Sequence, residues 1–211
     1  MMEKSFLPAA HWSFLTRYYE TLSWPLAHRL WKRIATEVSQ RATHTAKIVD
    51  LGCGPGTVLR TIAKLRPDLQ LHGLDIDPAI IGIARRKSAH VSVTYEVASI
   101  ANLPIADASV DIAVSSLMFH HLDTDTQRAA FREVRRILKP NGIFLLCDIS
   151  IPPKKWITPI AALLYSFEPS APLQIHGQLF TLAAEHGATM ENLWSAFGCI
   201  SAYVITFPKP S

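Results

Sequence analysis

The residues with the clearest chemical meaning lie in a glycine-rich segment, positions 49 to 57, which reads Val-Asp-Leu-Gly-Cys-Gly-Pro-Gly-Thr. It overlaps the short apolar run 48–51, which predicts a buried strand ending in a glycine turn. Glycines at alternate positions let the backbone turn sharply and let a ligand approach the peptide groups without meeting a Cβ atom. Because ligands of open α/β sheets bind beyond the carboxyl ends of the strands, this loop is predicted to hold a ligand.

The spacing of these glycines disfavours two common nucleotide-binding loops. The NAD fingerprint G-x-G-x-x-G requires glycine at position 57, but Thr57 stands there and the third glycine is Gly56. A phosphate P-loop requires Gly-Lys-Ser/Thr after its first glycines, and no such run follows. The ligand is therefore expected to be held by a different motif.

An acidic residue follows the next predicted strand, which spans residues 69–74. Asp75 stands there, and its carboxylate has two acceptor oxygens that can bind both ribose hydroxyls of an adenosine. Asp77 precedes Pro78 and has a second interpretation, as the N-cap of a helix beginning at Pro78.

Several side chains have the chemistry of a proton acceptor or a lid. His120 and His121 follow the fourth predicted strand on the side of the ligand crevice, where an imidazole can act as a general base. The alternative is that this pair only starts the following helix. His176 is a weaker candidate, and Tyr18 and Tyr19 either close over the ligand or pack between helices.

The elements that must position these residues alternate between strand and helix from Lys47 onward. Strands are predicted over 48–51, 69–74, 91–97, 110–115 and 143–149, with closing strands near 189–197 and 202–207. Helices are predicted over 58–65, 78–87, from about 123, and over 173–187 with Gly187 as C-cap. Lys139–Gly142 is predicted as a turn. This order predicts an α/β fold with a doubly wound, mostly parallel, seven-stranded sheet and helices on both faces.

Two segments stand outside this alternation. Residues 1–44 carry apolar residues at helical spacing and predict an N-terminal helical cap or lid, so that the ligand-binding domain spans 45–211. Residues 150–172 contain five prolines and several apolar side chains, which predicts an insertion rather than a core element.

Composition narrows the class of protein. A hydrophobic share of 49% and a net charge of +4 predict a globular domain, and no basic stripe with interleaved aromatics indicates nucleic acid. Cys53, Cys147 and Cys199 form neither a CxxC pair nor a zinc-spaced cluster, so no metal site is predicted and a reducing cytoplasm is expected. We expect no signal peptide and no membrane span, while contact with a membrane surface stays open.

The run Asp50–Gly56 resembles the D-x-G-x-G-x-G motif of the class I S-adenosylmethionine-dependent methyltransferases at every defined position. The resemblance implies a Rossmann-like fold, S-adenosyl-L-methionine as cofactor, and methyltransferase activity. It also implies that the three glycines surround the methionine moiety, that Asp50 orients the loop or the ammonium group, that Asp75 binds the ribose and that Ile76 lies against the adenine. The implied cofactor-binding residues are Asp50, Gly52, Cys53, Gly54, Gly56, Asp75, Ile76, Ser99, Ile100 and Ser115.

Two further landmarks match the same family, and one position departs from it. The segment 103–111 resembles the family's approach to its fourth strand, and Leu138–Gly142 resembles its "LKPGG" turn. The family usually places Asp two positions after the third strand, to bind the adenine amino group. Ser99 or Ile100 stands there, so adenine recognition is expected to use backbone groups or to be weaker.

The N-terminal segment points to a kind of acceptor. Residues 18–24 and 28–33 resemble the N-terminal helices of the ubiquinone/menaquinone biosynthesis C-methyltransferases, which implies a small hydrophobic, aromatic or quinone-like acceptor. The apolar side chains expected to line its entrance are Trp12, Phe14, Trp24, Trp156, Leu163, Leu164 and Tyr165. The chain is shorter than those enzymes and differs from them over 115–122. The prediction is therefore the wider small-molecule family, with oxygen, nitrogen and carbon acceptors all open.

Three rival functions differ from this one in the motifs that they require. Thr57 and the lack of a Tyr-x-x-x-Lys pair disfavour a nicotinamide-dependent oxidoreductase. A base-flipping methyltransferase would carry Asp/Asn-Pro-Pro-aromatic where this chain has Ser115–Met118. A non-catalytic cofactor-binding or scaffolding protein of the same fold stays open because of Ser99.

Overall fold

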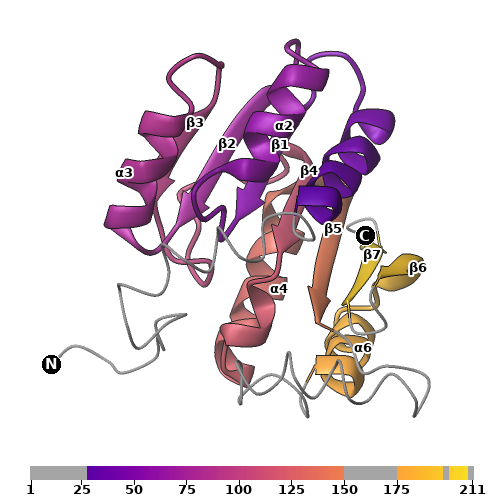
Figure 1. Cartoon of the computed structure of the whole chain (residues 1–211). Helices are drawn as coiled ribbons and strands as arrows, with labels where there is room; N and C mark the ends of the chain where they lie inside the picture. The colour runs from indigo at the N-terminus through magenta and orange to yellow at the C-terminus, as the bar shows by residue number, and fades with distance from the viewer. Residues whose placement is uncertain (1–27, 150–174, 197–199, 209–211) are drawn as a thin grey trace, which may run out of the picture.

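The computed structural model describes residues 28–149, 175–196 and 200–208, which form one seven-stranded sheet flanked by helices (Figure 1). The order of strands across the sheet is β3-β2-β1-β4-β5-β7-β6. The strands are β1 (Lys47–Leu51), β2 (Gln70–Asp75), β3 (Thr94–Val97), β4 (Val110–Ser116), β5 (Leu138–Ile149), β6 (Thr189–Ala196) and β7 (Ile200–Thr206). The predicted fold class is confirmed.

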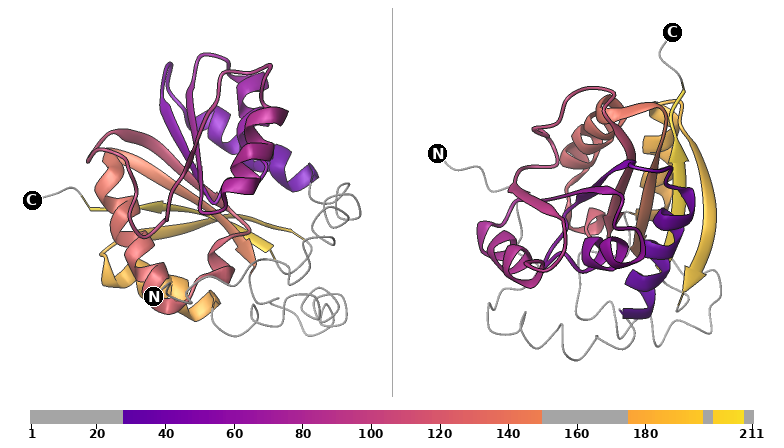
Figure 2. Two further views of the ribbon diagram at one scale, coloured as in Figure 1. Left: turned by 90° about the vertical axis from the view of Figure 1, so that its left-hand side faces the viewer. Right: turned by 90° about the horizontal axis from the view of Figure 1, so that it is seen from above.

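The helices cover both faces of this sheet (Figures 1 and 2). They are a helix over residues 28–41, α2 (Thr57–Leu65), α3 (Pro78–Lys87), the short 3₁₀ helix η1 (Phe119–His121), α4 (Thr124–Ile137) and α6 (Ile175–Glu185). One buried cluster joins the sheet to the 28–41 helix, α2 and α3, and a second joins it to α4 and α6. Neighbouring residues of one strand, such as Ile48 and Val49, fall in different clusters because side chains alternate across a sheet. Both faces are therefore buried, as the apolar strands require.

Five parallel strands bring their carboxyl ends to one edge of the sheet. β1 pairs in parallel with β2 and β4, β2 with β3, and β4 with β5. β7 runs antiparallel to both β5 and β6, so the sheet is mixed at one end. The segments that follow β1, β2, β3 and β4 therefore share one side of the molecule, and the predicted site residues lie in these segments or at the ends of these strands.

The predicted turn at Lys139–Gly142 is wrong, because these residues lie inside β5. The pairing of β4 with β5 shifts here, so that Val110 faces Leu138 and Ile112 faces Ile143. The extra residues of β5 are accommodated as an irregularity, and the Lys139 Nζ lies 2.8 Å from Asp111 Oδ2. A Cβ at position 142 would come within 3.0 Å of the Lys139 carbonyl oxygen, which explains the glycine.

The helix ends agree with the sequence. The Asp77 side chain accepts from the Ala79 amide at 2.8 Å, so its interpretation as the N-cap of α3 is confirmed. Asp123 caps α4 in the same way, with Thr126 as donor at 2.7 Å. Gly187, just after α6, has a φ of +62°, a left-handed conformation that glycine adopts at little cost.

The proposed division of the chain falls largely outside the described residues. Residues 1–27 of the predicted cap and the whole predicted insertion, 150–172, lie there, together with Tyr18, Tyr19 and the apolar residues expected at the entrance. Within the 28–41 helix, Leu30, Ile34 and Val38 are buried in the same cluster as β1 and α2. Within the described ranges, no helix has the length and apolar character needed to cross a membrane.

Phe131 of α4 is predicted to be a main support of the sheet. It is fully buried, and its ring centroid lies 5.9 Å from that of Phe119 and 6.1 Å from that of Phe144, both edge-on. Phe131→Ala is expected to lower the free energy of unfolding by about 3–5 kcal/mol, measured by urea denaturation. The control is Phe180→Ala, since Phe180 is 46% exposed and its edge-on contact with Tyr203 is worth about 1 kcal/mol. Equal losses in both variants would contradict this assignment.

Candidate functional site

The glycine loop after β1 is tied to the end of β2 by backbone hydrogen bonds. The amides of Gly52 and Cys53 both donate to the carbonyl oxygen of Leu74, at 2.8 and 2.9 Å. The amide of Gly54 donates to Asp75 Oδ2 at 2.9 Å. The structure thus brings the predicted loop and the predicted ribose-binding carboxylate into direct contact.

Each glycine of the motif has its own physical reason. All three adopt a positive φ, at +69° for Gly52, +51° for Gly54 and +76° for Gly56. A Cβ at Gly52 would overlap the Met118 side chain, and a Cβ at Gly56 would overlap the Tyr95 hydroxyl. A Cβ at Gly54 would meet no atom of the described residues within 4 Å, so this part of the structure leaves the loop open on that side. Side chains therefore pack against the first and third glycines of the loop, and the middle glycine, Gly54, is accessible.

A buried carboxylate lies directly before the loop. Asp50 is fully buried, and neither of its oxygens has a hydrogen-bond partner among the described residues. Burial, followed by repulsion from the Asp75 charge, raises the pKa of Asp50 from 3.8 to about 7. A buried acceptor without a donor is costly, so Asp50 favours a ligand or water that can donate to it.

Cys53, the motif residue between the first two glycines, is also buried. Burial, with the nearby charge of Asp50 as the second cause, raises the pKa of the Cys53 thiol. The side chain is therefore uncharged near neutral pH and contributes packing to the loop rather than a charged ligand group.

The segment beyond β2 and β3 combines a carboxylate with apolar side chains. The Asp77 amide donates to Asp75 Oδ1 at 3.1 Å, and the Ala98 amide donates to the Asp75 carbonyl at 3.0 Å. Ile76 and Val97 are each 46% exposed, although both are large and apolar. Since Asp75 pairs with Val97 across the strands, this exposed apolar surface borders the carboxylate. An apolar surface beside a carboxylate suits a flat ring joined to a sugar.

Ser99 and Ile100 follow this surface, as predicted. The Ser99 Oγ accepts from the Ala101 amide at 3.3 Å, and Ser99 forms an isolated bridge with Asn102. Ile100 is half-buried against the cluster beneath α4. Ser115 is placed differently, because its hydroxyl is fully buried and donates to the Leu51 carbonyl at 3.0 Å. Direct contact of these three residues with a ligand stays a prediction.

The two histidines lie in η1, which follows Met118 directly. His120 is buried, and its Nδ1 lies 2.5 Å from Asp148 Oδ1 at the end of β5. The His121 ring packs on the His120 ring, with 3.9 Å between centroids. Burial, and then the neighbouring His120, lowers the pKa of His121 to about 4. The Met118 side chain, one residue before η1, is the group that a Cβ at Gly52 would overlap.

Four residues of this region were not found from the sequence. Tyr95, Val97 and Met118 lie in or after strands that read as ordinary apolar segments, and nothing in their spacing predicts contact with the loop. Asp148 gave a usable signal, because an acid stands near the end of the apolar strand β5. His176 lies among the residues whose side chains the structure does not describe.

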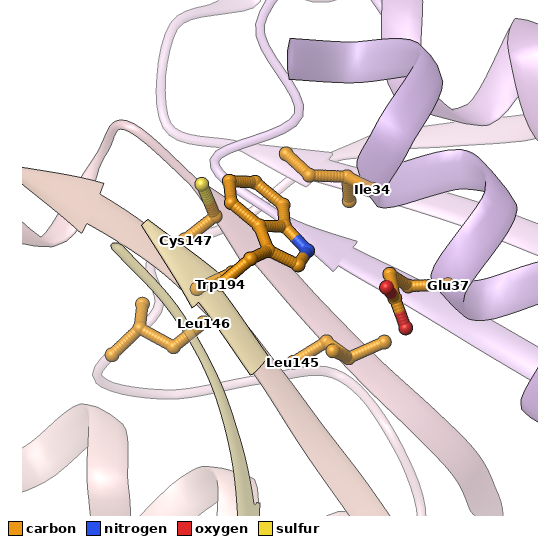
Figure 3. Close-up of a pocket in the computed structure, with 7 residues that line it drawn as sticks. Ile34, Glu37, Leu145, Leu146, Cys147 and Trp194 are labelled. Carbon is orange, nitrogen blue, oxygen red and sulfur yellow. The ribbon is translucent and has the colours of Figure 1, made fainter. Parts of the chain in front are cut away.

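An apolar pocket lies elsewhere in the molecule, between the 28–41 helix and the sheet (Figure 3). It is lined by Ile34, Glu37, Leu145, Leu146, Cys147, Trp194 and Ala202. Trp194 also packs against Arg33, whose guanidinium carbon is 4.4 Å from the ring centroid. No residue of the glycine loop lines this pocket, and it brings together no group that could handle a proton beyond Glu37. The candidate site is therefore the carboxyl edge of the sheet.

Comparison with known proteins identifies the class. Residues 48–142 match the methyltransferase domain family. The chain is 35% identical to a ubiquinone/menaquinone biosynthesis C-methyltransferase from Rubrivivax gelatinosus, over 66% of this chain and 53% of that protein. It is 34% identical to a malonyl-[acyl-carrier protein] O-methyltransferase from Hahella chejuensis, over 48% of this chain and 35% of that protein. The chain thus spans about half or less of the length of these relatives.

Solved structures show the same fold. A TehB-like S-adenosylmethionine-dependent methyltransferase from Corynebacterium glutamicum aligns with a TM-score of 0.68 and 19% identity, over 92% of this chain and 97% of that one. The match of residues 48–142 to the methyltransferase domain family confirms the predicted resemblance to the class I methyltransferases.

S-adenosylmethionine is the cofactor of this class, and the site fits it. Asp50 offers unpaired acceptor oxygens, Gly54 leaves the loop open, and Asp75 borders the exposed surface of Ile76 and Val97. These groups suit an ammonium, a methionine chain and an adenosine in turn. The residues that would hold the cofactor are those of the loop and the ends of β2 and β3.

Alanine substitutions at two motif glycines are expected to separate strain from overlap. Gly54→Ala meets only the cost of a left-handed residue, about 1–2 kcal/mol of unfolding free energy. Gly56→Ala adds an overlap with Tyr95 and is expected to cost clearly more. Urea denaturation measures both, and calorimetry should show that both weaken S-adenosylmethionine binding. Equal destabilisation by the two substitutions would show that Tyr95 does not support the loop.

Asp50 is expected to make stability depend on pH. Its pKa is raised in the folded state, from 3.8 to about 7. The protonated carboxyl therefore contributes to stability in full below about pH 4, where the group is protonated in the folded and the unfolded chain alike. This contribution is lost as the pH rises through about 7. The shift of about three units corresponds to roughly 4 kcal/mol. Asp50→Asn removes the charge, so its unfolding free energy relative to the unmodified protein should be higher at pH 8 than at pH 5. A difference independent of pH would contradict the assignment.

Proposed function

We propose that this protein transfers a methyl group from S-adenosyl-L-methionine to a small hydrophobic, aromatic or quinone-like acceptor. The observation that supports the proposal best is the buried, unpaired carboxylate of Asp50 before a glycine loop that is open at Gly54. Asp75, the ribose-binding candidate, contacts the same loop, because its Oδ2 accepts a hydrogen bond from the Gly54 amide. The arrangement supports a ligand that carries both an ammonium and a sugar.

The choice of acceptor rests on similarity. The Rubrivivax gelatinosus relative is a ubiquinone/menaquinone biosynthesis C-methyltransferase, and its match covers 66% of this chain. A quinone-like acceptor also agrees with the apolar residues near the N-terminus and in 150–172, which lie outside the described residues. The Hahella chejuensis relative is an O-methyltransferase, so a screen for the acceptor must include both oxygen and carbon acceptors.

The chain's own residues have a limited task. S-adenosylmethionine, when bound, supplies an electrophilic methyl group on a sulfonium, and the protein must align the acceptor and exclude water. The glycine loop and Asp75 orient the donor side. An acceptor that carries a proton must lose it, and we assign the proton acceptor to the His120–His121 pair of η1, at the carboxyl edge of the sheet.

Calorimetric titration with S-adenosylmethionine and S-adenosylhomocysteine tests the cofactor assignment. Micromolar binding is expected, and Asp75→Ala should abolish it because the ribose acceptor is lost. Asp75 also holds the Gly54 amide, so the melting temperature of the variant must be measured alongside. The matched control is Asp77→Ala, which removes only the α3 cap at a cost of about 1 kcal/mol and should bind normally.

The outcomes distinguish the candidate functions. Binding that is lost only in Asp75→Ala supports the site, and a screen of phenolic and quinone-like acceptors for S-adenosylhomocysteine release then tests the activity. Binding without any methylated product would favour a cofactor-binding or scaffolding protein. Unchanged affinity in Asp75→Ala would refute the assignment of the ribose site.

A further inference from the structure

The strongest unassigned feature of the molecule is a buried ion pair or hydrogen bond at the edge of the candidate site. His120 Nδ1 lies 2.5 Å from Asp148 Oδ1, and the two side chains are 4% and 1% exposed. Asp148 also accepts two backbone amides, from His120 at 3.2 Å on Oδ2 and from Ile149 at 2.7 Å on Oδ1. The carboxylate is therefore held rigidly in one orientation toward the imidazole.

This geometry determines which imidazole nitrogen carries a proton. An ionised carboxylate only accepts hydrogen bonds, so the proton between the two groups belongs to His120 Nδ1. In the neutral ring the basic lone pair is then on Nε2. A carboxylate at the other nitrogen also stabilises the imidazolium that forms when Nε2 takes up a proton.

The pair lies next to the donor side of the site. β4 and β5 are parallel neighbours, with Ser116 opposite Cys147, so η1 and Asp148 both lie at the carboxyl edge. Met118, which precedes η1, occupies the space against Gly52 of the glycine loop. The amide of Gln127 in α4 fixes η1 from the other side by donating to the Phe119 and Leu122 carbonyls, at 3.0 and 3.2 Å.

We propose that Asp148 is a positioning residue that holds His120 as the proton acceptor of the methyl-transfer reaction, an inference that rests on the proposed function. The acceptor's bond to hydrogen breaks, its proton moves to His120 Nε2, and its electron pair forms the bond to the incoming methyl carbon. The electrons of the carbon–sulfur bond remain on sulfur. The positive charge lost from the sulfonium is thus matched by the charge gained on the imidazole.

The neighbouring titratable groups assign different tasks to the two histidines. His120 faces Asp148 on β5 and the His121 ring on its own element, while the group of α4 that bonds to η1 is the neutral Gln127 amide, at the Phe119 carbonyl. The His121 ring has a weaker claim as base, because burial and His120 lower its pKa to about 4. Asp148 contacts the His120 ring directly, at 2.5 Å, so its carboxylate stabilises the charged form of His120 most strongly, and we assign the proton to this ring.

Two substitutions in the full chain test the proposal, each with a matched exposed control. Asp148→Asn removes the charge but keeps one acceptor oxygen for the backbone amides, and its control is Asp125→Asn, whose side chain is 98% exposed. His120→Gln removes the base, and its control is the exposed His44→Gln. The melting temperatures of all four variants are first compared, to establish that each variant folds. Their affinities for S-adenosylhomocysteine should then agree with that of the unmodified protein within about twofold.

The first readout needs no acceptor. Two-bond ¹H–¹⁵N spectra of protein labelled at histidine report the tautomer and the pKa of each ring, with His120 assigned through His120→Gln. We expect the Nδ1-protonated tautomer in the unmodified protein. In Asp148→Asn we expect the His120 pKa to fall by about one unit or more, because the imidazolium loses its carboxylate. An Nε2-protonated ring, or a pKa independent of Asp148, would overturn the proposal whether or not the variant is stable.

The second readout is turnover of an acceptor found in the phenolic and quinone-like screen. His120→Gln should lower kcat by about 10²–10⁴-fold with little change in KM. Asp148→Asn should lower kcat less and move the acidic limb of its pH profile to lower pH, since a neutral imidazole then persists to lower pH. A merely structural pair would leave that limb in place. Loss of cofactor binding in the unmodified protein would refute the proposed function instead, so the two failures are distinguishable.

Discussion

Two hydrogen bonds to one carbonyl set the position of the whole candidate site. The amides of Gly52 and Cys53 both donate to the Leu74 oxygen, which fastens the loop after β1 to the last residues of β2. Because Asp75 follows Leu74, the same junction places its carboxylate under the Gly54 amide. With the loop fixed at the end of β2, Met118 packs against Gly52 and Tyr95 packs against Gly56.

The edge of the sheet contains two buried carboxylates that differ in their hydrogen bonds. Asp148 is fully used by an imidazole and two backbone amides. Asp50 has no partner among the residues that the structure describes, and its raised pKa records the cost of keeping it so. A protein selected only for stability would not keep such a group, and unsatisfied polar atoms commonly mark sites where function opposes stability. The carboxylate near η1 thus has its hydrogen bonds within the protein, whereas the carboxylate before the glycine loop has acceptor oxygens left for a ligand.

The sequence allowed the fold and the cofactor side to be predicted because both rest on local patterns. The strands are short apolar runs, and the bounds of α3 and the caps at Asp77 and Asp123 follow from residue types within one turn. The turn at Lys139–Gly142 failed because strand pairing with β4 absorbed these residues, which is a non-local effect.

The same distinction explains what was missed in the site. The contacts of Tyr95 with Gly56 and of His120 with Asp148 join residues 39 and 28 positions apart in the chain (95 − 56 and 148 − 120), so no local spacing predicts them. The glycine motif gives the identity of the loop but not the side chains packed beneath it. The role of Asp148 needed the register of β4 and β5, which brings the ends of the two strands together.

The burial of Cys53 affects the reactivity of its thiol toward an electrophilic ligand. Thiolates are strong nucleophiles toward alkylating agents, and a sulfonium methyl donor is an alkylating agent by design. Cys53 sits inside the loop that is assigned to the donor, yet burial and the neighbouring carboxylates raise the pKa of its thiol. The side chain therefore stays in its protonated form, which is the less nucleophilic one, inside a loop assigned to an electrophilic ligand.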